Sequence, residues 1–87
     1  MLRKIDYKLS VHAATVMAER EIMETWVERV LAGPERTEPD ATDPLLRHAL
    51  GRIPERNDRV LRVIYNETVH PWRVVTAYFD RAKRGKL

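Results

Sequence analysis

A chain of 87 residues, 44% of them hydrophobic, is long enough for one compact domain and too short for two, so we predict a single domain over residues 1–87. The absence of cysteine excludes disulfide bonds, thiolate metal sites and a cysteine nucleophile, and it is typical of a cytoplasmic protein. The net charge of +3 is modest, and no apolar run approaches the roughly 20 residues that span a bilayer, so we expect no membrane contact.

The first third of the chain predicts a short strand followed by two helices. Residues 4–9 alternate between polar and apolar side chains, which is the period of a half-buried strand. Ser10 precedes a run of helix-forming residues and is a favoured N-cap, because its hydroxyl can accept from a free backbone N–H. A second helix is indicated by apolar residues at three- and four-residue spacing over residues 22–31, and a Gly-Pro pair ends it. We place a bend between the two helices near Glu21.

The remainder of the chain predicts strands. Residues 35–38 form at most an edge strand, because the surrounding prolines cannot take part in a central ladder. Three further strands are indicated at residues 47–53, 59–67 and 72–80, with turn-forming residues between them. We therefore predict an α+β fold, in the order β-α-α-β-β-β, with two N-terminal helices on one face of a mainly antiparallel sheet of four to five strands. Residues 81–87 are basic, and we expect them to be a frayed tail.

Several segments of the chain resemble one known family. The segments SVHAATVMAEREI and VERVLAGPE, followed by RVLRVIYN and RVVTAYFDR, are similar in sequence and order to the family named domain of unknown function 4258. That family is similar in fold to the RelE/ParE and BrnT-like toxins of bacterial toxin–antitoxin pairs. The resemblance implies a small sheet with two N-terminal helices. It also implies mRNA cleavage on the ribosome without a metal or other cofactor, and an antitoxin protein as partner.

RNA cleavage of this kind needs a base for the 2′-hydroxyl, a cation for the charged phosphorane and an acid for the leaving oxygen. His12 titrates near neutral pH and is one candidate, although a purely structural role for His12, and for Arg20 two helical turns later, stays open. Strand alternation places Arg62 and Tyr78 on the sheet face away from the helices. We therefore predict His12, Arg62 and Tyr78 as the catalytic residues.

The same alternation assigns the other residues of the late strands to faces. In the last strand we expect Val75, Ala77 and Phe79 to face the helices, and Val74 to lie on the outer face with Tyr78. The predicted RNA-binding residues, from the outer face and the basic tail, are His48, Arg52, Arg81, Lys83 and Arg84. An ordinary solvated face with cross-strand polar pairs is the alternative. The three histidines lack ligand spacing, so we expect no metal site.

These observations favour a toxin-like RNA-binding protein or metal-independent ribonuclease in the cytoplasm. Its expected partners are RNA or the ribosome and an antitoxin protein. The absence of a compact catalytic constellation leaves open whether the protein is an enzyme at all. The alternative is a non-catalytic module that binds a protein partner, or a second copy of itself, through a sheet edge or the region of Trp72.

Overall fold

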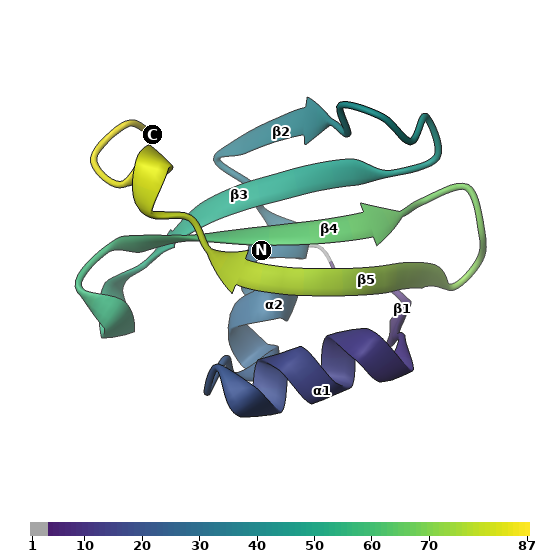
Figure 1. Ribbon diagram of the computed structural model, residues 1–87, viewed down its shortest axis with the longest axis horizontal. Coiled ribbons are helices and arrows are strands. Elements are labelled where there is room, and N and C mark those ends of the chain that lie inside the picture. Colours follow the sequence, from purple (N-terminus) through teal and green to yellow (C-terminus); the bar gives the residue numbers. More distant parts are fainter. Residues whose placement is uncertain (1–3) are drawn as a thin grey trace.

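The structure, a computed structural model, describes residues 4–87, so residues 1–3 of the predicted domain lie outside the described part. Two helices cover one face of a five-stranded sheet (Figure 1), which confirms the predicted α+β class. The elements are β1 (Tyr7–Leu9), α1 (Val11–Glu19), α2 (Glu24–Ala32), β2 (Arg36–Pro39), β3 (Arg47–Ile53), β4 (Arg59–Asn66) and β5 (Trp72–Phe79), with the 3-10 turns η1 (Pro54–Arg56) and η2 (Arg81–Lys83). No helix among residues 4–87 is long and apolar enough to cross a bilayer.

The sheet is mixed, in the order β1-β5-β4-β3-β2, and this corrects the mainly antiparallel sheet that we predicted. Strands β2 to β5 form the expected antiparallel meander. Strand β1 instead lies parallel to β5, with Tyr7 opposite Trp72 and Leu9 opposite Val74. The pairing joins the first and last strands of the chain, so no local sequence pattern reports its direction.

A hydrogen-bonding side chain fixes each end of helix α1. Ser10 caps the helix as predicted, because its hydroxyl accepts a hydrogen bond from the backbone N–H of Ala13 at 3.0 Å. At the other end, Arg20 donates from Nη1 to the carbonyl of Ala77 at 2.8 Å, so it clamps the helix to the sheet. The bend follows directly, with Glu21 in the left-handed region at φ 56°.

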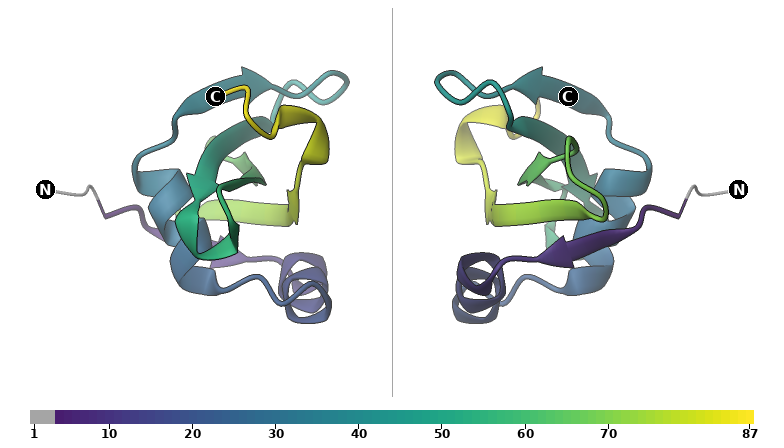
Figure 2. Two further views of the ribbon diagram at one scale, coloured as in Figure 1. Left: turned by 90° about the vertical axis from the view of Figure 1, so that its left-hand side faces the viewer. Right: turned by 90° about the vertical axis from the view of Figure 1, so that its right-hand side faces the viewer.

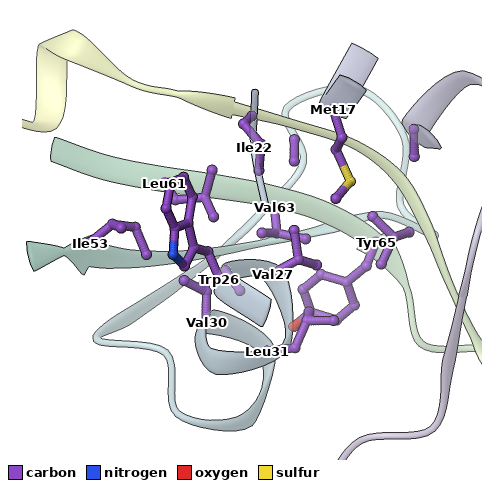
Figure 3. Close-up of a cluster of buried hydrophobic side chains, with 14 residues drawn as sticks. Met17, Ile22, Trp26, Val27, Val30, Leu31, Ile53, Leu61, Val63 and Tyr65 are labelled. Carbon is purple, nitrogen blue, oxygen red and sulfur yellow. The ribbon is translucent and has the colours of Figure 1, made fainter. Parts of the chain in front are cut away.

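The main core lies between the helices and the sheet (Figure 3). Helix α2 presents Trp26, Val27, Val30 and Leu31 to β3 and β4, where Leu61 and other apolar side chains meet them. Strand β3 has a glycine facing α2: a Cβ on Gly51 would lie 3.1 Å from Cγ2 of Val30. The absence of a side chain there therefore sets how closely the helix packs.

A β-bulge changes which residues of β5 face the core. Ile64 is opposite Thr76, but Tyr65 is opposite Val74, so Val75 is the extra residue. Val74 is consequently 0% exposed within the core, and our prediction that it lies on the outer face is wrong. A bulge inverts the strict alternation on which that prediction depended.

The segment after β5, which we predicted to be a frayed tail, begins with an ordered turn. Asp80 accepts a hydrogen bond from the backbone N–H of Ala82 at 3.0 Å and so caps η2. In Figures 1 and 2 this yellow segment lies over the sheet face that the helices leave uncovered. Lys83, in the same turn, lies 3.8 Å from a carboxylate oxygen of Glu38 on β2. Ordered contacts on the outer face therefore hold residues 81–83.

Candidate functional site

Arg62 lies on the outer sheet face, as predicted, but it is buried and held by carboxylates. Its Nε donates to Oδ2 of Asp80 at 2.9 Å, and its Nη2 lies 2.8 Å from the same oxygen. Its Nη1 donates to Oε1 of Glu38 at 3.0 Å. The Arg62 side chain is only 8% exposed. Two carboxylates thus neutralise this guanidinium, and it has little surface with which to contact a substrate.

His48 extends this network toward the loop after β2. Its Nδ1 lies 2.7 Å from Nη1 of Arg62, and its Nε2 lies 2.7 Å from Oδ1 of Asp40. A guanidinium can only donate, so Nδ1 accepts and Nε2 carries the proton that is donated to Asp40. The backbone N–H of Asp43, with His48 and the backbone N–H of Thr42, holds the pKa of the Asp40 carboxyl well below its usual range. Both ring nitrogens of His48 are therefore engaged within the fold.

The other predicted residues are divided between different places. Arg52 forms an ion pair with Glu35 at 2.7 Å, so Arg52, like Arg62, is paired with a carboxylate on the outer face. Tyr78 pairs with Arg62 in the register between β4 and β5. His12 is exposed on α1, in the helical layer. The sheet therefore separates His12 from Arg62, and the structure does not bring the three predicted catalytic side chains together.

Segments that carry five other arginines meet at one end of the molecule, the end that faces the viewer in the left panel of Figure 2. These arginines come from the end of α1, from η1, from the start of β4 and from the C-terminal segment, and we call them the arginine surface: Arg20, Arg56, Arg59, Arg81 and Arg84. Within residues 4–87, none of the five forms an ion pair with a carboxylate, in contrast to Arg29, Arg47, Arg52 and Arg62. Positive charge that the fold leaves uncompensated is thus concentrated at this end.

The arginine surface contains two adjoining hollows. The first has a volume of about 420 Å³ and is lined by Arg20, Arg56, Arg59, Tyr78, Phe79 and Arg81. The second has a volume of about 460 Å³ and shares Arg59, Phe79 and Arg81 with the first, while Asp80 and Arg84 complete it. The two hollows therefore form one continuous concave surface that combines guanidinium groups with aromatic rings.

Contacts within the fold fix several of these guanidiniums without cancelling their charge. The guanidinium of Arg59 lies over the ring of Phe79, 4.5 Å from its centroid, and that of Arg56 lies 5.4 Å from the ring centroid of Trp26. Arg20 and Arg56 each donate one hydrogen bond to a backbone carbonyl, at 2.8 and 3.2 Å. The remaining N–H groups stay available, and little side-chain entropy is left to lose on binding an anion.

Only part of the arginine surface was predictable from the sequence. Tyr78, Arg81 and Arg84 were among the predicted residues, but Arg56 and Arg59 were not. Both flank the turn in which Asn57 and Asp58 have positive φ values of 56° and 58°. The only sequence feature that could have indicated Arg56 and Arg59 is that they flank this tight turn. The position of the turn beside α1 follows only from the tertiary fold.

The described residues contain no obvious place for a metal ion. Across residues 4–87, no three histidine, aspartate or glutamate side chains lie close enough together to ligate one. A separate hollow of about 460 Å³ lies near β1. It is lined mainly by polar residues, including Glu24 and Glu28. Both carboxylates lie within hydrogen-bonding distance of the Tyr7 hydroxyl, and burial together with these contacts raises the pKa of that hydroxyl.

Comparison with known proteins gives one match. The family model described as "Domain of unknown function (DUF4258)" matches residues 9–79, from the last residue of β1 to the last residue of β5. No curated protein and no solved structure has significant similarity to the chain. Since the family match includes both helices and the whole β2–β5 meander, the chain belongs to the DUF4258 family.

Proposed function

We propose that this protein is a toxin-like RNA-binding protein of the cytoplasm, and that its arginine surface is where the RNA binds. The observation that carries this proposal is the distribution of charge. Five arginines from separate segments of the fold gather without carboxylate partners, while Arg62 and Arg52 on the expected face are neutralised. Uncompensated cations that converge on one concave surface favour binding of an anionic ligand.

The chemistry of the surface supports RNA as that ligand. Guanidinium groups hydrogen-bond phosphate oxygens in bidentate geometry. Tyr78 provides an aromatic ring beside them, on which an unpaired base can stack, whereas the Phe79 ring already carries the Arg59 guanidinium. The hollows are small and local, so a single strand fits them better than a duplex. The choice of RNA over DNA follows from the resemblance to RelE/ParE and BrnT-like toxins, which also suggests the ribosome and an antitoxin protein as partners.

A ribonuclease activity would depend on Tyr78 in this arrangement. Tyr78 lines the first hollow together with four arginines, where a phenol can transfer a proton and guanidiniums can stabilise a charged phosphorane. His12 is exposed on α1 and is not among the residues that line this hollow. Tyr78, and not His12 or Arg62, is therefore the residue of the predicted catalytic set whose position suits cleavage.

The binding proposal is tested with a fluorescently labelled single-stranded RNA of 12 nucleotides. Its binding is followed by fluorescence anisotropy over a range of salt concentrations. The variant Arg59→Gln/Arg81→Gln should bind the RNA more weakly. The slope of the logarithm of its binding constant against the logarithm of salt concentration should be smaller in magnitude by about 1.4, or about 0.7 for each phosphate that is no longer neutralised. The matched control is Lys8→Gln/Arg73→Gln, which removes two exposed cations from β1 and β5 outside the hollows. Equal affinity and slope for the two double variants would contradict the proposal.

Cleavage is tested separately by expressing the intact protein in bacteria and mapping mRNA ends by primer extension. Growth arrest with new mRNA ends, both abolished by Tyr78→Phe and retained by His12→Ala, supports the ribonuclease activity. If expression of the intact protein is harmless and leaves mRNA uncut, the ribonuclease part of the proposal is wrong. The binding part is then judged by the anisotropy experiment alone.

The alternative function is a module that binds a protein partner or a second copy of itself, and the surroundings of Trp72 give it less support. That side chain is half-buried and stacks on Tyr65, with ring centroids 5.2 Å apart and planes at 17°, so it is already occupied within the monomer. Light scattering distinguishes the two functions. A stable homodimer that has no affinity for RNA would favour the module.

A further inference from the structure

We propose that the first hollow of the arginine surface binds the terminal phosphomonoester of a single-stranded RNA, so that the protein recognises a strand end. This inference rests on the proposed function and specifies which part of the RNA this site takes. It depends on the number of guanidiniums around one small hollow, on how they are held, and on the surface that continues from it.

The charge around the hollow exceeds what one internal phosphate needs. An internal phosphodiester carries one negative charge, whereas a terminal phosphomonoester carries about 1.5 to 2 at pH 7 and has three acceptor oxygens. Four guanidiniums line the first hollow, and no carboxylate lines it. A protein that follows an RNA backbone would spread such cations along a groove, but here they surround a single volume of about 420 Å³.

The hollow also has the size and preorganisation of a site for one terminal group. Its volume falls within the range of about 300–1,000 Å³ typical of small-molecule sites, which accommodates a terminal nucleotide and not a duplex. Arg59 is stacked on Phe79, and Arg20 and Arg56 are each fixed by a backbone carbonyl. Guanidiniums that are already positioned lose little entropy when they bind three phosphate oxygens.

The second hollow provides a path for the rest of the strand. It shares Arg59 and Arg81 with the first hollow and adds Arg84, which can pair with the next phosphate. Asp80 also lines it, but its Oδ2 lies 2.8 Å from Nη2 of Arg62, so this carboxylate is already paired from the sheet side. Tyr78, at the first hollow, offers a ring on which the terminal base can stack.

The test compares three hexaribonucleotides of one sequence that carry the same internal fluorophore. One has a 5′-phosphate, one has a 3′-phosphate and one has hydroxyl groups at both ends. We expect at least one phosphorylated oligomer to bind about tenfold or more tightly than the hydroxyl-ended one, and the two phosphorylated arms tell which end is recognised. The ratio should decrease between pH 7.5 and 5, because the second ionisation of a phosphomonoester lies near pH 6. Taking the ratio cancels titration of the protein itself.

Variants of the first hollow test whether the preference for a terminal phosphate arises there. Arg59→Gln and Arg20→Gln should each reduce the preference for a terminal phosphate, whereas the exposed control Arg73→Gln should keep it. Arg20→Lys retains the charge and serves as a second variant if Arg20→Gln unfolds, which circular dichroism would reveal.

Equal binding of all three oligomers, with affinity still dependent on Arg59, would overturn the strand-end inference and leave the proposed function intact. A preference that survives both Arg59→Gln and Arg20→Gln would also overturn it. No binding of any oligomer would overturn both the inference and the proposed function.

Discussion

Replacing Asp80 with asparagine tests whether Arg62 is a structural cation. Asp80 contacts both Nε and Nη2 of Arg62, while Glu38 contacts only Nη1. Removing one partner of a buried ion pair costs about 3–5 kcal/mol. The Asp80 side chain is 15% exposed and Glu38 remains in place, so we expect a smaller loss of about 2–3 kcal/mol in the free energy of unfolding. In a domain of this size such a loss lowers Tm by about 10–20 °C.

Urea denaturation followed by circular dichroism measures this loss. The control is Glu67→Gln, which removes the partner of Arg47 in an exposed pair of 3.6 Å and should change the free energy of unfolding by less than about 0.5 kcal/mol. Adding Arg62→Met to Asp80→Asn should recover part of the loss, because it removes the buried guanidinium that has lost one of its two carboxylate partners. An Asp80→Asn protein as stable as the Glu67→Gln control would refute the assignment of Arg62 as a structural cation.

Three further predictions concern the fold. Gly51→Ala should lower the free energy of unfolding in urea by about 1–2 kcal/mol, because the new Cβ would lie 3.1 Å from Val30. Adding Val30→Ala should restore part of that stability. A Gly51→Ala protein as stable as the unsubstituted protein would contradict this prediction. Ser10→Ala should cost about 1 kcal/mol through loss of the N-cap, whereas Ser10→Asp should retain most of the stability. Glu38, through its hydrogen bond from Arg62, and Asp40, through the Asp43 N–H, have lowered pKa values in the fold. These carboxylates stabilise the fold above about pH 4, near their pKa in the unfolded chain, and this stabilisation is lost as the pH falls below that value. The urea midpoint should therefore fall on acidification, and a midpoint that rises would contradict the prediction.

Much of the fold was predictable because the relevant signals are local. The predicted bounds of 47–53 match β3, and the late strands end at turn residues that the sequence displays. The cap at Ser10 and the bend at Glu21 follow from the chemistry of a few neighbouring residues. The parallel position of β1 and the bulge beside Val75 were not predictable, because each depends on which strand lies opposite.

The candidate site was harder to predict, since the sequence does not reveal which charges neutralise one another. Arg62 and Asp80 are far apart in sequence and pair only once β4 and β5 are in register. Alternation correctly assigned Arg62 to the outer face, but it could not show that two carboxylates would bury it there. Conversely, Arg20 and Arg56 are distant in sequence, and the fold brings both to the hollow beside Tyr78.

The most direct test of the central claim, that RNA binds the arginine surface, is to map the contact by NMR. A ¹⁵N-labelled protein would be titrated with a short single-stranded RNA while its backbone amide resonances are followed. If RNA binds the arginine surface, the largest shifts occur at Arg20, at residues 56–59 and at residues 78–84, with little change in β2 and β3. The largest shifts around His48 and Arg52, or an unchanged spectrum at saturating RNA, would contradict it.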